Sequence, residues 1–367
     1  MVMSIMDLMR PHLKSVKPYV PGKPIEELRR ERNFDGEIIK LASNENPYEP
    51  IDEVRQAIID ELPQINRYPN SGCFYLCGEL AKYHALQASQ IFVGNGSNEI
   101  IDLIVRAFVN PDEEIVYPWP SFIVYPIVSQ LAGVKAIEVP LKDYRLDLPA
   151  MRKAVTSKTK IVFICNPNNP TATYVSKSEV ERFLDGLSES VLVVFDEAYY
   201  EYVAASDFPD TIARIKDRPN VIVLRTFSKI HSLSAVRIGY SLSHEDVVTC
   251  LHKVRQPFNV NSIAQSAALA ALRNMDKLAV RAKENRDELR FVREELQKLG
   301  FVIPPSQTNF LLAVPPHGSG AIVDQLMDRG IIVRPMKPFG LGDETFRVTI
   351  GTPYENRKFI ETLKGLI

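Results

Sequence analysis

The sequence has few cysteines and almost no net charge. Only Cys73, Cys77, Cys165 and Cys250 occur among 367 residues. No second pair accompanies Cys73 and Cys77, so the spacing of a metal-ligand cluster is missing. We therefore expect packing thiols, no bound metal and a reducing compartment. A formal net charge of −1 gives no reason to expect a nucleic-acid partner.

Long apolar runs are also missing. No stretch approaches the ~20 apolar residues that span a bilayer. The opening segment MVMSIMDLMRPHLKSVKPYVPG is interrupted by Asp7, Arg10 and Lys14, so it lacks the apolar core of a signal peptide. We expect a cytoplasmic protein without a membrane partner. Internal repeats and low-complexity tracts are missing too, and proline-rich places such as KPYVPGKP indicate connectors.

What the sequence does have is a series of short apolar runs rich in β-branched residues. Such runs are typical of strands covered on both faces, and the helical periods between them predict a mostly parallel sheet in an α/β fold. Between the third and fourth runs, Val180, Phe183, Leu184 and Leu187 share one helical face, which indicates a βαβ unit. The runs are 91–94, 114–117, 160–165, 191–196 and 221–224.

The pattern changes near Ser262. Residues 262–274 and 277–300 predict long helices, with Gly300 as a helix-ending glycine. Since one hydrophobic core stops growing at ~250 to 300 residues, we expect a second, smaller α+β domain here. Strands at 309–314 and 345–351 and a final helix from Tyr354 would complete it. The predicted units are an N-terminal arm (1–44) that packs on the small domain, a large α/β domain (45–262) and the small domain (263–367).

Polar side chains follow several of the predicted strands. In open α/β sheets, ligands bind beyond the carboxyl ends of the strands. The turn NGSNEI, with Ser97 or Asn98 as a helix cap, suits an anion. The amide loop NPNNPT follows, then Asp196 at a strand end and Lys229 after another. Each has an ordinary explanation as a turn, a cap or a surface lysine, but together at one sheet edge they indicate a binding site.

One cofactor needs this combination of groups. Pyridoxal phosphate requires a lysine amine, an acid at the pyridine nitrogen, donors for the phenolic oxygen and an anion site for the phosphate. The segments NPNNPT, DEAYYEY and TFSKIHSLSAVRIGY resemble the signature blocks of class I and II pyridoxal-phosphate aminotransferases. Further segments, from LASNENPYEP at Leu41 to FRVTIGTPYEN at Asn356, resemble the histidinol-phosphate aminotransferase family.

The resemblance implies a fold, a reaction and an assembly. The fold would be fold type I, with a large and a small domain. The reaction would be a ping-pong transamination between L-histidinol phosphate and 2-oxoglutarate, giving imidazole acetol phosphate and L-glutamate, in L-histidine biosynthesis. Tyr68 in NRYPN matches a tyrosine that reaches the phosphate from the partner subunit, which implies a homodimer with shared active sites.

The resemblance also assigns roles residue by residue. Lys229 would hold the cofactor covalently and shuttle a proton, and Asp196 would keep its pyridine nitrogen protonated. Asn169 and Tyr199 would bind the phenolic oxygen, and Phe122 would stack on the ring. The phosphate would be held by Ser97, Asn98, Thr226, Ser228 and Arg237, together with Tyr68. Substrate contacts would come from Tyr19, Asn44, Asn309, Arg334 and Arg347.

The chain departs from the family pattern where glycine is usual, at Glu49, Ala172, Ser232 and Ala235. A side chain there would strain the loop if φ is positive, or stabilise the fold through the unfolded chain if φ permits it. Both outcomes stay open on sequence alone. Every predicted cofactor contact is retained, so we expect cofactor binding to be intact.

Other functions remain possible on the same pattern. Within this chemistry they are an aromatic-amino-acid aminotransferase and a phosphothreonine decarboxylase. A non-catalytic binding protein with this fold is disfavoured because Lys229 and Asp196 are both retained. A dinucleotide-dependent dehydrogenase is disfavoured because no GxGxxG follows a strand.

Overall fold

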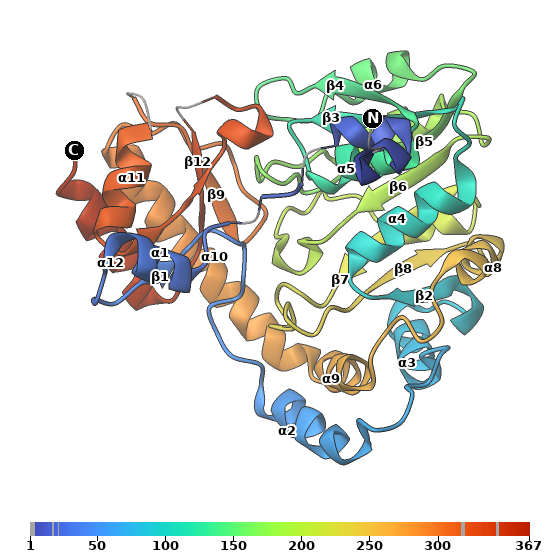
Figure 1. The fold of residues 1–367 in the computed structure, drawn as a ribbon, viewed down its shortest axis with the longest axis horizontal. Coiled ribbons are helices and arrows are strands. Elements are labelled where there is room, and N and C mark those ends of the chain that lie inside the picture. The colour runs from blue at the N-terminus through green and yellow to red at the C-terminus, as the bar shows by residue number, and fades with distance from the viewer. Residues whose placement is uncertain (1–3, 17, 21, 317–319, 343–344) are drawn as a thin grey trace.

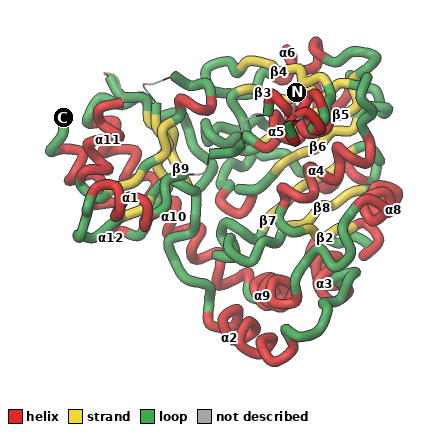
Figure 2. The backbone as a smooth tube through the Cα atoms, in the orientation of Figure 1, coloured by secondary structure: helices red, strands yellow, loops and turns green. Residues whose placement is uncertain are grey.

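The computed structural model describes residues 4–16, 18–20, 22–316, 320–342 and 345–367. Figure 1 shows a large part built around one sheet and a smaller part reached through the long helix α10 (Met275–Lys298). In Figure 2 the strands of the large part run side by side between layers of helices. The predicted division into an α/β part and a smaller α+β part is confirmed, while the exact domain boundaries remain a prediction.

The large sheet has seven strands in the order β2-β8-β7-β6-β5-β3-β4. Only β8 pairs antiparallel with its neighbours, so the predicted mostly parallel sheet is confirmed. The sequence did not indicate β4 or β8, because β4 is an edge strand with exposed residues and GYSLS in β8 is too polar. The strands are β2 (Ile91–Gly94), β3 (Glu114–Trp119), β4 (Lys135–Pro140), β5 (Thr159–Cys165), β6 (Leu192–Asp196), β7 (Val221–Thr226) and β8 (Gly239–Ser243).

Each central strand contributes to two cores. In β5, Ile161 and Phe163 enter the core on one face, whereas Val162 and Ile164 enter the core on the other. This alternation is why the central strands are apolar at every position. One face is covered by α4 (Ser97–Phe108), α5 (Val124–Ala132) and α8 (Glu245–Val254). The other is covered by α3 (Phe74–His84), α6 (Leu148–Ala154), α7 (Lys177–Asp185) and α9 (Ser262–Arg273), with α2 (Asp52–Glu61) packed on α9.

The smaller part contains a three-stranded antiparallel sheet in the order β11-β12-β9. Gly300 has φ +84° just beyond the end of α10, as its predicted role as a helix stop requires. The apolar faces of α10 and α12 pack with β9 and β12 into a separate core. The remaining elements are β9 (Phe310–Ala313), α11 (Gly320–Asp328), β10 (Ile331–Ile332), β11 (Arg334–Pro335), β12 (Phe346–Thr349) and α12 (Pro353–Lys364).

The N-terminal segment contacts both parts. Strand β1 (Ile39–Lys40) pairs with β10, and Leu28 of α1 (Ile25–Arg32) is buried beside Ala42 and Ile332. The earlier 3₁₀ turn Pro11–Ser15 lies against α5 instead. Other 3₁₀ turns are Ile5–Leu8, Leu62–Gln64, Ala88–Gln90, Tyr200–Tyr202, Ile212–Ile215 and Lys337–Phe339.

The cysteines, the potential metal ligands and the long helices bear on two alternatives, a metal site and a membrane span. Cys73, Cys77 and Cys165 are buried free thiols. Over the ranges given above, no three His, Cys, Asp or Glu side chains gather closely enough to hold a metal ion. The helices of those ranges also include none with both the length and the apolarity needed to cross a bilayer.

Candidate active site

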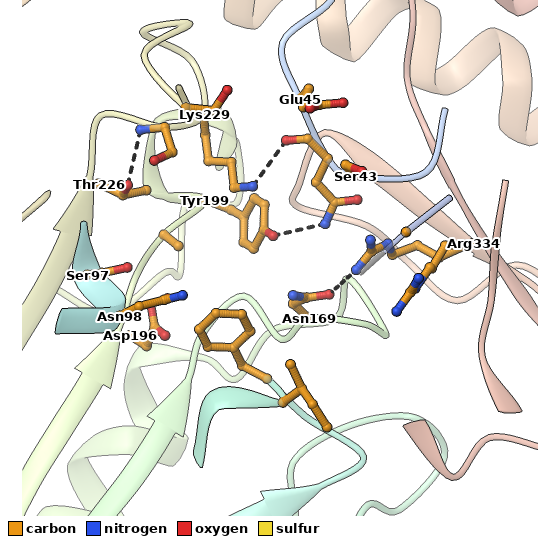
Figure 3. Close-up of a pocket in the computed structure, with 18 of the residues that line it drawn as sticks. Ser43, Glu45, Ser97, Asn98, Asn169, Asp196, Tyr199, Thr226, Lys229 and Arg334 are labelled. Carbon is orange, nitrogen blue, oxygen red and sulfur yellow. Dashed lines mark hydrogen bonds between the residues drawn. The ribbon is translucent and has the colours of Figure 1, made fainter. Parts of the chain in front are cut away.

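A cavity of about 320 Å³ lies where the carboxyl ends of the sheet strands meet the N-terminal segment and the small sheet. Figure 3 shows side chains from all three regions pointing into it. Every predicted site residue except Tyr68 and Asn309 lines this cavity. Those that do are Tyr19, Asn44, Ser97, Asn98, Phe122, Asn169, Asp196, Tyr199, Thr226, Ser228, Lys229, Arg237, Arg334 and Arg347.

Lys229 lies three residues beyond β7, in a loop fastened to that strand. Within the loop, Ser228 N–H donates to Thr226 Oγ1 at 3.1 Å. The lysine Nζ donates to the Asn44 carbonyl oxygen at 3.2 Å and lies 5.5 Å from the Tyr199 ring centroid (Figure 3). Burial lowers the pKa of Lys229 to about 8, and the positive charge of Arg347 adds to this. With this pKa, roughly a tenth of the amine is unprotonated and nucleophilic at pH 7, far more than for a lysine with its ordinary pKa.

Asp196 ends β6 and is 2% exposed. Its Oδ2 accepts a hydrogen bond from the Tyr125 hydroxyl at 2.9 Å, whereas its Oδ1 has no partner among the described residues. Burial raises the pKa of Asp196 to about 6, and the hydrogen bond from Tyr125 opposes this rise. A buried carboxylate oxygen without a partner is costly. The cavity therefore offers an acceptor for a ligand N–H at this point.

Two hydrogen bonds join the large domain to the other walls of the cavity, one to the N-terminal segment and one to the small sheet. Asn44 Nδ2 donates to the Tyr199 hydroxyl at 2.9 Å, and Arg347 Nη1 donates to Asn169 Oδ1 at 2.5 Å (Figure 3). Arg347 Nη2 also donates to the Ala42 carbonyl at 2.8 Å, while its Nε lacks a partner within the described part of the chain. Burial lowers the pKa of Arg347 to about 10. A buried guanidinium in this setting is suited to an anionic ligand.

Arg334 provides a second guanidinium on the same side of the cavity. Its Nη2 donates to the Val20 carbonyl at 3.0 Å, and its guanidinium carbon lies 5.3 Å from the Phe339 ring centroid. The arginine therefore joins the small sheet to the N-terminal segment that carries Tyr19. Arg334 and Arg347 are paired neighbours on β11 and β12. Their two positive charges make this wall of the cavity a candidate binding site for a carboxylate or a phosphate.

A different anion site lies at the start of α4. Gly96, with φ +81°, is the residue that caps this helix, so the predicted cap at Ser97 or Asn98 is wrong; both belong to its first turn. Glycine is favoured here because of this backbone angle, and an added Cβ would also lie 2.5 Å from Arg237 Nη2 and displace it. Arg237 also approaches Ser228, with Nη1 3.4 Å from its Oγ. The helix start and this guanidinium together favour an anion such as phosphate.

The two predicted residues outside the cavity have different surroundings. Tyr68 is 83% exposed, and its ring stacks on Phe258 with centroids 4.6 Å apart. Asn309 is buried behind the cavity wall, where its Nδ2 donates to the carbonyls of Asn44 (3.1 Å) and Glu45 (3.4 Å). Asn309 thus fixes the backbone that receives the Lys229 amine. Asn309 is not among the residues that line the cavity, and its buried Oδ1 has no partner among the described residues.

Several residues that line the cavity or lie directly behind it were not predicted from the sequence. Tyr125 was missed because one tyrosine on an apolar helix gives no signal of its role. Ser43 and Glu45 belong to the quoted segment LASNENPYEP, so the resemblance could have indicated them. The unpredicted residues that line the cavity include Ser43, Glu45, Ile123, Ser234 and Phe339.

The usual glycine positions divide into two groups. Ala172 has φ +66° and Ser232 has φ +61°, so these side chains occupy a backbone region that favours glycine. At Ser232 the unfavourable backbone conformation is partly offset, because its Oγ accepts a hydrogen bond from Arg281 Nη1 of α10 at 3.2 Å. Ala235 and Glu49 have no positive φ. Among these four positions, backbone strain is therefore confined to Ala172 and Ser232.

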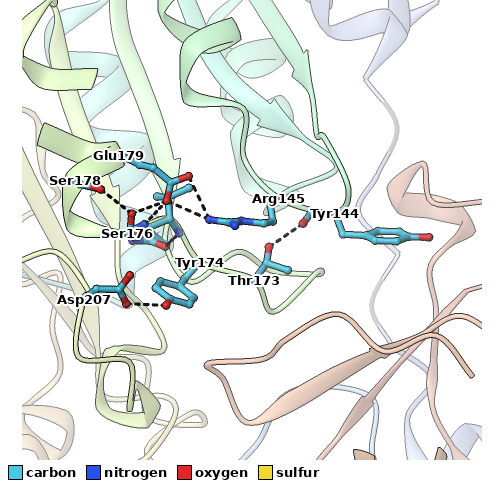
Figure 4. Close-up of polar contacts among 10 residues, drawn as sticks. Tyr144, Arg145, Thr173, Tyr174, Ser176, Ser178, Glu179 and Asp207 are labelled. Carbon is cyan, nitrogen blue, oxygen red and sulfur yellow. Dashed lines mark hydrogen bonds and ion pairs between the residues drawn. The ribbon is translucent and has the colours of Figure 1, made fainter. Parts of the chain in front are cut away.

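The chain beyond Ala172 is fastened by polar contacts (Figure 4). Thr173 Oγ1 donates to the Tyr144 carbonyl at 2.7 Å, and the Tyr174 hydroxyl donates to Asp207 at 2.7 Å. Glu179 then caps α7 by accepting from the Ser176 N–H at 2.7 Å. These contacts fix the far end of the loop that carries Asn169, so the amide is held at a defined place in the cavity wall.

The family model for class I and II aminotransferases matches residues 36–363. The chain belongs to this family and is an aminotransferase. Its fold is that of the pyridoxal-phosphate-dependent transferases of fold type I. An aspartate aminotransferase from Thermus thermophilus shares this fold, with a TM-score of 0.83 at 20% identity over 98% of this chain and 99% of that one.

Within the family, the chain is similar to histidinol-phosphate aminotransferases over nearly its whole length. One from Carboxydothermus hydrogenoformans is 42% identical over 98% of this chain and 99% of the relative. Another from Moorella thermoacetica is 40% identical over 98% and 92%. The solved histidinol-phosphate aminotransferase from Sinorhizobium meliloti, in complex with pyridoxal-5'-phosphate, has a TM-score of 0.88 at 27% identity, covering 98% of each chain.

Proposed function

We propose that this aminotransferase moves the amino group between L-histidinol phosphate and 2-oxoglutarate in L-histidine biosynthesis. The observation that carries the proposal is a cavity with two separate anion sites on either side of one buried amine. Gly96 and Arg237 form the first site, and Arg334 and Arg347 form the second. A cofactor phosphate in the first leaves the second for the substrate's phosphate, or for a carboxylate of glutamate.

The residues present fit pyridoxal phosphate. Asp196 Oδ1 lacks a partner in the described structure and would accept a hydrogen bond from a protonated pyridine nitrogen. Asn169 and Tyr199 would bind the phenolic oxygen, Phe122 would cover one face of the ring, and Lys229 would provide the covalent attachment. When bound, the cofactor would supply an electron sink for negative charge at the substrate carbon.

The chain itself would orient the substrate and move its proton. Arg347 and Arg334 would hold the anionic end, which fixes the Cα–H bond relative to the cofactor ring. The Lys229 amine would be the group that takes up and returns the proton at the substrate Cα. Burial and the charge of Arg347 favour its unprotonated form, so it is suited to act as this base.

A two-fold homodimer with shared active sites is part of the proposal. Tyr68 and Phe258 form an exposed aromatic pair, and further exposed apolar side chains lie near Tyr68 in sequence. Large exposed apolar residues of this kind favour a protein partner. The further residues are Ile59, Leu62, Ile65, Phe74 and Tyr75.

Mixing two inactive variants tests the shared site. A subunit with Lys229→Ala retains Tyr68, and one with Tyr68→Ala retains Lys229. Random reassortment would rebuild one intact site in each mixed dimer, restoring about a quarter of the wild-type activity. No recovery after verified subunit exchange would contradict the shared site.

Single-turnover absorbance tests the reaction itself. The holoenzyme is mixed with excess L-histidinol phosphate and no keto acid, and the visible band of the bound cofactor is followed. We expect rapid loss of this band with histidinol phosphate and much slower loss with phenylalanine at the same concentration. Bleaching by phenylalanine alone would instead favour an aromatic-amino-acid aminotransferase.

A further inference from the structure

Tyr125 is buried directly behind Asp196. It belongs to α5, is 0% exposed, and does not line the cavity. Its hydroxyl donates to Asp196 Oδ2 at 2.9 Å. The ring is held between aromatic neighbours: it stacks on Phe163 with centroids 4.7 Å apart and 11° between planes, and it meets Phe122 edge-on at 5.8 Å. The hydroxyl therefore has little freedom to leave the carboxylate.

The two oxygens of Asp196 have different surroundings. Oδ2 is occupied by Tyr125, whereas Oδ1 has no partner within the described residues. The charged and titratable groups that act on this carboxylate or feel it are Glu197, Lys229, Cys165 and Tyr199, together with Tyr125 itself. Burial favours the protonated acid, and the bond from Tyr125 is the strongest opposing influence. A phenol in this position supports the ionised carboxylate.

We propose that Tyr125 is a positioning residue for the cofactor acid, whose hydroxyl holds the ionised carboxylate of Asp196 with Oδ1 presented to the pyridine nitrogen. The inference rests on the proposed function. The same ring contacts Phe122, which is proposed to cover the cofactor face, so one side chain supports both the nitrogen edge and the face of the ring. A tyrosine suits this task because burial raises its own pKa far above the usual value, so it remains a donor at every working pH.

The test compares four proteins with the wild type: Tyr125→Phe, Asp196→Asn, the double variant, and Tyr117→Phe as a matched control. Tyr117 is 1% exposed, belongs to the same core, and donates to Glu138 Oε1 at 3.0 Å away from the cavity. Each single Tyr→Phe change thus deletes one buried hydroxyl that bonds a carboxylate. The measurement is the dissociation constant of pyridoxal phosphate from the apoenzyme, titrated by absorbance across a range of pH, with apoenzyme melting as a folding check.

We expect Tyr125→Phe to weaken cofactor binding about tenfold or more, because a hydrogen bond to a charged group is lost. The acid limb of the affinity profile would move about one pH unit upward, since a carboxylate without its donor protonates more readily. Tyr117→Phe would leave both quantities at the wild-type value. In the Asp196→Asn background, the Tyr125 change would add almost nothing, because the group that it acts through has been neutralised.

Three results would overturn the inference. One is a Tyr125→Phe profile that matches that of Tyr117→Phe. Another is a Tyr125 effect that persists at full size in the Asp196→Asn background, which would make its role independent of the acid. The third is that the wild type and Asp196→Asn bind the cofactor with the same affinity, or that neither of them binds it. That result would remove the proposed function along with the inference, whereas the first two leave the proposed function intact.

Discussion

The two sides of the cavity are built in different ways. On the large-domain side, Asp196 ends strand β6 and Lys229 lies three residues beyond the adjacent strand β7 of the same sheet. On the opposite side, Tyr19 and Asn44 come from the N-terminal segment, while Arg334 and Arg347 come from the small sheet. Changes on the first side should therefore affect every substrate, whereas changes on the second can separate one substrate from another.

The largest effect is expected on the large-domain side. Lys229→Ala removes both the attachment point and the proton carrier, so turnover should fall by about 10⁴-fold with every amino donor. The visible cofactor band should be lost as well. Steady-state rates and the absorbance spectrum check this, with the exposed Lys216→Ala as the matched control. Turnover within a factor of ten of the wild type would contradict the assignment of Lys229.

The two arginines of the opposite side should behave differently from each other. Arg347→Gln should lower kcat/KM by roughly 10 to 100-fold for both histidinol phosphate and glutamate, because a bidentate, desolvated contact is lost. Arg334→Gln should affect mainly the phosphate substrate, since a phosphate has more oxygens to bind than a carboxylate. Kinetics with both donors test this comparison. Equal losses for both donors in both variants would refute the separation.

The same contrast explains what the sequence could predict. Central strands are buried on both faces, so their apolar runs are visible, and the polar residues at their ends can be assigned to one edge of the sheet. Edge strand β4 and polar strand β8 lack that pattern. Arg334 and Arg347 became site residues only through family resemblance, because one arginine in a short strand gives no local signal.

Contacts that depend on tertiary packing could not be predicted from the sequence. The bond from Tyr125 to Asp196 joins residues 71 positions apart, and Asn309 reaches Asn44 across 265 positions. Gly96 caps α4 in place of Ser97, with φ +81° and the Arg237 guanidinium packed against it. No periodicity or spacing encodes such an approach.

The pH dependence should show how the two sides are coupled. Lys229 has a pKa of about 8, so its reactive amine increases as pH rises through that value, and apoenzyme reconstitution with pyridoxal phosphate should accelerate about tenfold per pH unit below it. Affinity should decline as pH falls through about 6, where Asp196 becomes protonated. Stopped-flow absorbance across this range measures both limbs.

A substitution of Arg347 should then shift the pH midpoint that reflects the pKa of Lys229. Arg347 lowers the pKa of Lys229 through its positive charge, so Arg347→Gln should shift the upper midpoint to higher pH. Arg334→Gln is the control, because Arg334 is not among the charges that act on the lysine. An unchanged midpoint in Arg347→Gln would show that the two sides are electrostatically independent.

The smallest effect is expected where the chain replaces a usual glycine. Ala172→Gly relieves an Ala at φ +66°, worth about 1 kcal/mol, but it also frees the unfolded chain by about 0.4 to 1 kcal/mol. The free energy of unfolding should therefore change by less than about 1 kcal/mol, with activity unaltered. Ala172→Val is the informative companion, because a β-branched residue at this buried, left-handed position should cost at least about 1 to 3 kcal/mol. Denaturant unfolding of both variants would decide whether the strain is real. If valine is tolerated as well as glycine, the loop adjusts freely and Ala172 stores no strain next to Asn169.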